Sequence, residues 1–258
     1  MAATFILNTR AEVLKIKKTA AFWITVFGAA FIPLVNFIRL VAKADHFSKF
    51  MQEDPWRIII KDHWEISAVF LLPMFVILIT SLVVQTEYRN NTWKQVYTSP
   101  RSYLDIFFTR FLVIQGLVLF CFLLFNGFIV LSSLAVDLLK PQYHFRDHAI
   151  PVGSLMEIMF KMYFSVITIT AVQYWLSLRF KNFIVPLGIG LALLITGLVI
   201  HRWEDLYYYP YMYPAIFYLP NFGSIEGFVQ KAELYNVIWF VAVLTLSFWD
   251  ISRRKERG

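Results

Sequence analysis

The side chains that could do chemistry are scattered and match no known catalytic or metal-binding motif. The sequence has no G-x-x-x-x-G-K-[ST] phosphate-binding loop, because Gly188 and Gly190 lie in an apolar run with no lysine after them. It also has no H-E-x-x-H zinc motif and no G-x-S-x-G nucleophile elbow. His144 and His148 have the spacing of two ligands on a helix, but Pro141 nearby disfavours a helix there. We therefore predict no catalytic residue, no metal site and no cofactor bound by this chain.

Polar residues inside apolar runs are the next candidates, because a charge is costly in lipid and is often functional there. Glu157 and Lys161 are four residues apart, so they could pair on one face of a helix near its outer end. We interpret them as structural, in preference to a proton relay or a substrate contact. Gln115, Asn126 and Gln173 are predicted to form hydrogen bonds between helices.

The remaining reactive side chains are isolated. Cys121 is the only cysteine and lies in an apolar run, so an intrachain disulfide is excluded and the thiol is expected to pack as a small apolar group. His46, His63 and His201 each stand alone, and we interpret them as ordinary loop or interfacial residues.

Long apolar runs dominate the chain. The sequence is 59% hydrophobic and only 16% charged, whereas a soluble domain is roughly a quarter charged. A membrane-spanning helix needs about 20 mainly apolar residues. Six runs are candidates, at residues 20–41, 66–84, 107–136, 155–178, 183–200 and 234–249, of which the last has the shortest strictly apolar part. The predicted fold is an all-α polytopic membrane protein with six transmembrane helices in a single domain, residues 1–258.

The net charge of +7 comes from basic residues at the ends of these runs. No zinc knuckle, RNP signature or basic helix with interleaved aromatics is present, so we predict no nucleic-acid partner. Basic residues favour cytoplasmic flanks, and they are denser in alternate connections, beginning with the N-terminal one. Both termini are therefore predicted to be cytoplasmic. The basic residues on the predicted inner side are Arg10, Lys15, Lys17, Lys18, Arg89, Lys94, Arg101, Arg110, Arg179, Lys181, Arg253, Arg254, Lys255 and Arg257.

Two further segments are predicted to lie at the membrane surface. Residues 4–18 alternate apolar and charged side chains, which is typical of an amphipathic helix on the inner surface, although a plain basic flank of the first span is the alternative. Residues 203–222 are too apolar for a free loop and too rich in proline for one helix. We predict broken helices that dip into the outer interface, the alternative being a purely anchoring aromatic belt. The candidate residues of this outer aromatic segment are Tyr207, Tyr209, Pro210, Tyr213, Pro214, Phe217 and Pro220.

The polar connection between the second and third spans holds the most informative pattern. It contains an acid at a span end, a polar turn and a tryptophan, followed by a proline. A short helix with a protruding aromatic is suited to contact a partner protein, because buried aromatics dominate interface energetics. A simple basic connector is the alternative. The residues that we assign to this segment are Glu87, Arg89, Thr92, Trp93, Lys94, Tyr97, Pro100 and Arg101.

This pattern resembles the ABC-2 type permease family. Glu87 begins an E-x-x-x-N-T-W sequence, a S-P-R-S sequence follows, and Arg110 enters the next span. Members usually have glycine where Asn91 stands, and asparagine tolerates the same turn. The six spans, the amphipathic N-terminal segment and the interrupted aromatic segment extend the resemblance over most of the chain. The small size is similar, more weakly, to the lantibiotic-immunity permease branch.

The resemblance implies a permease subunit of a bacterial ABC exporter in the cytoplasmic membrane, without an ATPase of its own. It implies a cytoplasmic ABC ATPase subunit that uses ATP and Mg, a second permease chain in a homo- or heterodimer, and surrounding membrane lipids as partners. Residues 87–97 would then contact the ATPase, and the complex would export an amphipathic substrate such as an antimicrobial peptide or a lipid-like molecule. The alternative from a different class is an ATP-independent integral-membrane enzyme or scaffold that acts on lipid-linked substrates.

Overall fold

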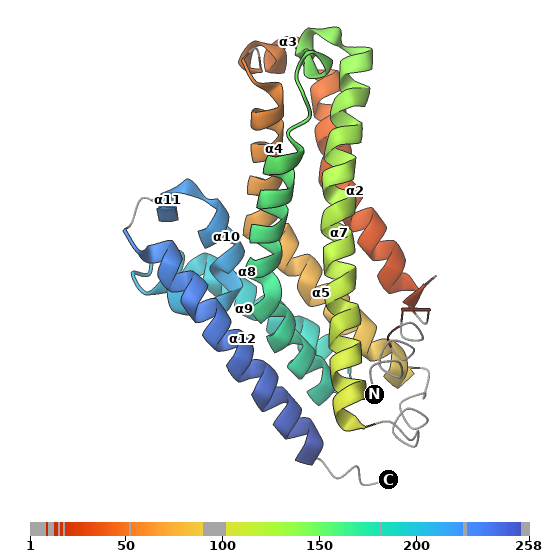
Figure 1. The fold of residues 1–258 in the computed structure, drawn as a ribbon, viewed down its shortest axis with the longest axis vertical. Helices are drawn as coiled ribbons and strands as arrows, with labels where there is room; N and C mark the ends of the chain where they lie inside the picture. The colour runs from red at the N-terminus through yellow and green to blue at the C-terminus, as the bar shows by residue number, and fades with distance from the viewer. Residues whose placement is uncertain are drawn as a thin grey trace.

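The computed structural model is a bundle of long helices with short helical turns between them (Figure 1). It describes residues 19–51, 53–89, 102–180, 182–223 and 226–253, together with residues 9, 13, 14, 16 and 17. The side chains of residues 87–89, 220 and 223 lie outside the description. The predicted amphipathic segment 4–18 is therefore described at only five positions, of which residues 9, 13, 14 and 16 are helical.

The described residues are helical almost throughout and contain no strand. The long helices are α2 (Ala20–Ala42), α4 (Pro55–Ile66), α5 (Leu72–Arg89), α7 (Tyr103–Leu139), α8 (Val152–Arg179), α9 (Ile184–Val199) and α12 (Phe228–Arg253). The short elements are α3 (Ala44–Phe47), η1 (Ser48–Phe50), the π-helical turn η2 (Ser67–Leu71), η3 (Pro141–Tyr143), η4 (Phe145–Asp147), η5 (Leu206–Tyr208), η6 (Pro210–Met212), α10 (Tyr213–Tyr218) and α11 (Pro220–Gly223).

Five helices in the described parts of the chain are long and apolar enough to cross a membrane. They are α2, the continuous helix Pro55–Thr86, α7, α8 and α12. The fifth predicted span corresponds to α9, whose 16 residues extend only about 24 Å, less than a hydrocarbon core of about 30 Å. The all-α polytopic fold is thus confirmed, with five full-length spanning helices and one shorter apolar helix.

The predicted boundaries of three spans were too narrow. The sixth span, predicted at residues 234–249, corresponds to the 26-residue helix α12. The helix of the second span begins at Pro55, not near residue 66, because α4, η2 and α5 form one continuous helix. The helix of the third span has 37 residues and extends about 55 Å, well beyond the hydrocarbon thickness. Figure 1 shows the far end of α7, together with α3 and the ends of α2 and α4, above the level of α10 to α12. The polar ends of long helices carry no apolar signal, so hydropathy alone does not reveal them.

Buried polar contacts hold this upper end of the bundle together. Trp56 at the start of α4 is buried, and its indole nitrogen donates to the carbonyl oxygen of Phe145 at 3.1 Å. Asp137 near the end of α7 is buried and accepts from the backbone N–H of Phe145 at 3.1 Å. The Arg146 side chain also donates to Asp137, at 2.7 Å. These contacts fix the turn between α7 and α8.

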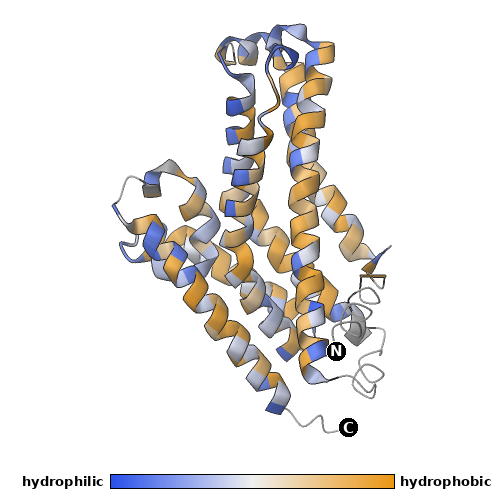
Figure 2. Ribbon diagram, in the orientation of Figure 1, coloured by the Kyte–Doolittle hydropathy of each residue, from blue (hydrophilic) through white to orange (hydrophobic). Residues whose placement is uncertain are grey.

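Hydrophobic residues extend along α2, α7 and α12, whereas hydrophilic residues gather in the upper loops and at helix ends (Figure 2). Helix α2 packs mainly against α7, and α8 packs against α5, α7 and α12. Helix α8 is therefore the central element of the bundle. His63 was wrongly interpreted as a loop or interfacial residue: it lies in α4 with 1% of its surface exposed, and its ring packs against Phe125 of α7.

Candidate functional site

Gln173, in the last third of α8, connects three helices. Its side-chain nitrogen donates to the Ser81 hydroxyl of α5 at 2.8 Å and to the carbonyl oxygen of Pro186 of α9 at 2.7 Å. The predicted interhelical role of Gln173 is confirmed.

Gly190 allows α9 to approach this contact. A Cβ atom at position 190 would lie 2.5 Å from the Gln173 side-chain oxygen and 2.7 Å from a methyl carbon of Ile77. Real Cβ contacts are not this short, so only glycine fits between α5 and α8 at this point. Close approach through small residues is the usual basis of helix packing in membranes. Gly188, by contrast, has open space where its Cβ would be.

A second set of hydrogen bonds joins α8 to α12. Thr168 and Asn236 are both fully buried, and the Thr168 hydroxyl lies 2.7 Å from the side-chain oxygen of Asn236. The Asn236 side-chain nitrogen donates to the carbonyl oxygen of Phe164 at 2.7 Å. Further along the same two helices, the Trp175 indole donates to Asp250 at 2.9 Å and Arg179 donates to it at 3.0 Å.

Helix α7 is tied to α8 at two heights. The Tyr174 hydroxyl donates to the carbonyl oxygen of Phe107 at 2.9 Å, and the Asn126 amide donates to that of Leu155 at 3.0 Å. The predicted interhelical hydrogen bond of Asn126 is thus confirmed. For Gln115, in contrast, no hydrogen bond to another helix is present among the described residues, and its side-chain oxygen is buried without a partner, as are those of Asn126 and Gln173. Together these contacts make α8 a polar spine that joins α5, α7, α9 and α12.

The predicted partner-contacting segment lies almost entirely outside the described residues. Its members Glu87 and Arg89 fall within the backbone of α5, but their side chains are not described, and Thr92, Trp93, Lys94, Tyr97, Pro100 and Arg101 are not described at all. The two helices that it connects are described. The end of α5 and the start of α7 lie at the same lower end of the bundle as the ends of α8 and α12 (Figure 1). At this end the Gln85 side chain donates to the carbonyl oxygen of Phe180 at 3.0 Å, which links α5 to the α8–α9 connection.

The outer aromatic segment consists of short helices interrupted at prolines, as the sequence predicts. Elements η5, η6, α10 and α11 divide it, and α10 packs against α8, α12 and η2. Tyr213, Pro214 and Phe217 are buried, whereas Tyr207, Tyr209 and Pro210 are half-buried and the Pro220 side chain is not described. The buried members contact protein, so they do not form a simple lipid-facing belt. The ring of Phe217 stacks on Phe164 of α8 at 6.0 Å between centroids.

Two tyrosine hydroxyls in this segment are enclosed without hydrogen-bond partners. They belong to Tyr211 and Tyr213. Burial raises the pKa of both phenols well above its ordinary value, so both stay protonated at neutral pH. Tyr209 is better satisfied, since its hydroxyl donates to the carbonyl oxygen of Leu193 on α9 at 2.7 Å. Gly197 of α9 makes room for Tyr209, since a Cβ there would be 3.0 Å from the tyrosine ring.

The remaining charged candidates show no ligand-binding geometry. Glu157 and Lys161 are both exposed on α8. His144 pairs with Asp147 at 2.8 Å within an exposed turn, and His148 is exposed beside it. Across the described parts of the chain, no group of three or more His, Cys, Asp or Glu side chains could hold a metal ion.

The fold and this spine define a multi-pass α-helical membrane protein whose helices are joined by buried polar contacts. The family model of the ABC-2 family transporter protein matches residues 9–197, which is more than half of the chain. The chain therefore belongs to the ABC-2 transporter family and is a membrane permease of the ABC transporter class. The match covers α2 to α9 and ends before the outer aromatic segment and α12. No curated protein matches the chain significantly.

Proposed function

We propose that this chain is the membrane-spanning subunit of an ABC exporter, driven by an ATPase on a separate polypeptide. The observation that carries the proposal is the family membership of a chain that has no phosphate-binding loop of its own. A permease of this class without such a loop needs a partner to hydrolyse ATP. The ATP and Mg would be bound by that partner, not by this chain.

The segment between α5 and α7 is the proposed contact with the ATPase. It contains Trp93 between an acidic span end and a proline, which is the pattern of an aromatic anchor for a partner groove. If the bound ATPase moved this segment, it would displace α5 and α7, the two helices that the segment connects. Both helices are hydrogen-bonded to α8 through Gln173 and Tyr174, so the displacement would reach the polar spine. From α8 it would pass to α12 and to the outer aromatic segment.

The complete complex would contain a second permease chain and two ATPase subunits in a bacterial cytoplasmic membrane, with both termini of this chain inside. The expected substrate is amphipathic, such as an antimicrobial peptide or a lipid-like molecule. An amphipathic substrate suits a permease whose exposed helix surfaces are apolar and whose upper loops are hydrophilic (Figure 2).

Substitutions in this segment test the proposal. Trp93→Ala and Glu87→Ala should leave the amount of permease in the membrane unchanged but reduce co-purification of the ATPase. Loss of a buried aromatic anchor costs about 2 kcal/mol or more, which is roughly thirty-fold in affinity. Trp203→Ala is the matched control, because Trp203 is an exposed tryptophan on the opposite, outer side of the proposed topology.

The measurements are the permease level, the recovery of ATPase and the substrate-stimulated hydrolysis rate on the same preparations. If both variants match wild type in all three, the segment is only a connector. If the purified native complex contains no stoichiometric nucleotide-binding subunit, the exporter proposal itself fails. The protein would then have to be assigned to ATP-independent membrane enzymes or scaffolds.

A further inference from the structure

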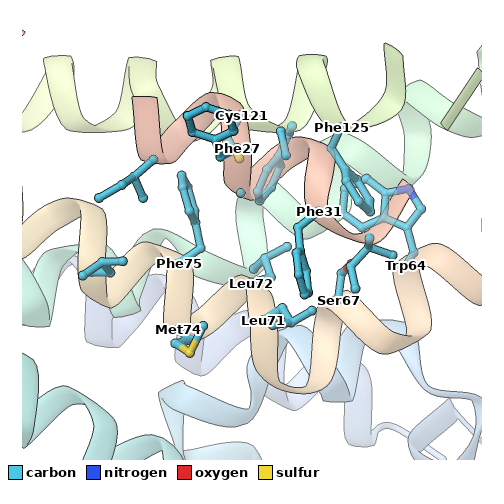
Figure 3. A pocket seen from close by; sticks show the side chains of 16 residues that line it. Phe27, Phe31, Trp64, Ser67, Leu71, Leu72, Met74, Phe75, Cys121 and Phe125 are labelled. Atoms are coloured by element: carbon cyan, nitrogen blue, oxygen red, sulfur yellow. The ribbon is translucent and has the colours of Figure 1, made fainter. Parts of the chain in front are cut away.

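A cavity of about 480 Å³ lies between α2, the continuous helix α4–η2–α5, and α7 (Figure 3). This volume is within the range of about 300–1,000 Å³ that is typical of ligand pockets. All the helices that form it are long enough to span a membrane. The cavity is separate from the polar spine of α8, because none of its lining residues belongs to α8.

The walls of the cavity offer almost no polar partner to a ligand. Ser67 lines it, but its hydroxyl already donates to the carbonyl oxygen of His63 at 2.7 Å. The thiol of Cys121 lies 3.8 Å from the carbonyl oxygen of Thr25. The indole nitrogen of Trp64 has no hydrogen-bond partner, but it is enclosed by protein and out of reach. Since a polar ligand group would lose its hydrogen bonds here, the cavity selects for a hydrocarbon ligand.

The cavity is elongated along the helix axes. Its lining extends from Ile24 to Ile32 on α2, roughly 12 Å, and from Trp64 to Leu78 along α4–η2–α5, roughly 20 Å. Half of a hydrocarbon core is about 15 Å thick. A single extended chain therefore fits this shape better than a compact ring system. The π-helical turn η2 contributes Ser67 and Leu71 to the wall, and such turns within α-helices are frequently found at functional sites.

The mouth of the cavity opens on the outward face of α2. Phe27 is 68% exposed and Phe31 is 55% exposed, and both line the cavity. They belong to an apolar stripe with helical spacing on α2. Its other exposed members are Trp23, Leu34 and Ile38. A stripe of this kind on a spanning helix is covered by lipid, so lipid acyl chains surround the mouth at high concentration.

Gly28 leaves the entrance of the cavity free of a side chain. It lines the cavity between Phe27 and Ala29, and a Cβ at this position would lie 3.3 Å from a ring carbon of Phe75 on α5. A larger side chain at position 28 would fill the space between α2 and Phe75. A glycine is not otherwise favoured in the middle of a helix.

We propose that this cavity binds one acyl chain of a membrane lipid. The chain enters between α2 and α5 and packs along η2 and α5. It thereby fills the space that separates α2 from α5, while α2 remains packed against α7. This proposal requires only that the helices lie in a membrane, so it holds or fails independently of the coupling to an ATPase.

Photo-crosslinking tests the proposal on the full-length chain. The purified protein is reconstituted, without ATPase or transport substrate, in phosphatidylcholine vesicles that contain a phosphatidylcholine with a diazirine in one acyl chain. After irradiation, crosslinked peptides are mapped by mass spectrometry. We expect the cavity walls at Leu71, Leu72 and Cys121 to be crosslinked more strongly than Leu131 and Val199, which are exposed and outside the cavity.

Gly28→Leu should reduce crosslinking of the cavity walls roughly tenfold, because excluding about two methylene groups of the lipid chain removes that much binding free energy. Gly127→Leu is the matched control, since a Cβ at Gly127 of α7 meets nothing within 4 Å. Leu78→Trp, which places a larger side chain on the opposite wall and so reduces the cavity volume, should also reduce crosslinking of the cavity walls. Size-exclusion profiles show which variants remain folded.

Two results would overturn the proposal. One is crosslinking that is no stronger in the cavity than at Leu131 and Val199, which would identify only ordinary surrounding lipid. The other is unchanged wall crosslinking in folded Gly28→Leu and Leu78→Trp proteins. If the cavity peptides crosslink to a second copy of the chain, the occupant is a neighbouring protein side chain and the lipid assignment is wrong.

Discussion

The hydroxyl of Thr168 on α8 lies 2.7 Å from both the backbone oxygen and the side-chain oxygen of Asn236 on α12. Both residues are completely buried. This hydroxyl thus takes part in joining the central helix to the last helix inside the packed bundle. The family match ends before α12, so this contact joins the matched part of the chain to the part that follows it.

Thr168→Val should destabilise the protein by about 1 kcal/mol, because hydrogen bonds between membrane helices contribute about 0.6 kcal/mol on average and up to about 1.7 kcal/mol. Thr170→Val is the control. Thr170 is buried in the same helix, and its hydroxyl donates to the carbonyl oxygen of Val166 in that helix, at 2.9 Å. Unfolding in detergent, followed by circular dichroism, measures both changes. Equal stability of the two variants would show that the Thr168–Asn236 contact contributes nothing.

Gly190→Ala should lower stability by about 1–3 kcal/mol, the usual cost of overpacking a filled interior. The new methyl group would meet the side chains of Gln173 and Ile77 at distances that force α9 away from α8. Gly188→Ala on the same helix should be neutral or slightly stabilising, because its Cβ enters open space and alanine favours a helix. A Gly190→Ala protein as stable as Gly188→Ala would contradict the close packing of α9.

Cysteine labelling should distinguish buried from exposed parts of the outer aromatic segment. In a protein with Cys121→Ala, Ala215→Cys should react poorly with a membrane-impermeant maleimide, since Ala215 is 1% exposed in α10. Asn221→Cys in α11 should react much faster, because Asn221 is exposed. Gln142→Cys, in the exposed turn after α7, gives the reference rate. Fast labelling at both 215 and 221 would mean that the segment is an open aqueous loop.

Reporter fusions test the predicted orientation. A fusion after Gly258 and another within residues 87–101 should report the cytoplasm, because basic residues cluster at both places. A fusion at Gln142 should report the outside. A C-terminal fusion that reports the outside would exclude the six-span arrangement with both termini cytoplasmic.

Much of the fold follows from local sequence. Runs of apolar residues long enough to span a membrane predict the helices, because lipid leaves the backbone no other way to satisfy its hydrogen bonds. The same reasoning finds Asn126 and Gln173, since amides inside such runs need partners on neighbouring helices. The prolines of residues 203–222 predict the broken helices η6 to α11. The E-x-x-x-N-T-W pattern resembles the family that the chain belongs to.

The tertiary structure decided which side chains meet. Gln115 and Gln173 look alike in sequence, yet Gln173 donates to groups on α5 and α9, whereas Gln115 makes no hydrogen bond to another helix among the described residues. His63 looks isolated in sequence and is buried, because the helix of the second span begins earlier than its apolar run. Gly188 and Gly190 are indistinguishable in sequence, but only Gly190 faces Gln173. The cavity beside Gly28 likewise depends on how far α2 stands from α5. Hydropathy and spacing describe one helix at a time, whereas these features depend on the rotation and separation of neighbouring helices.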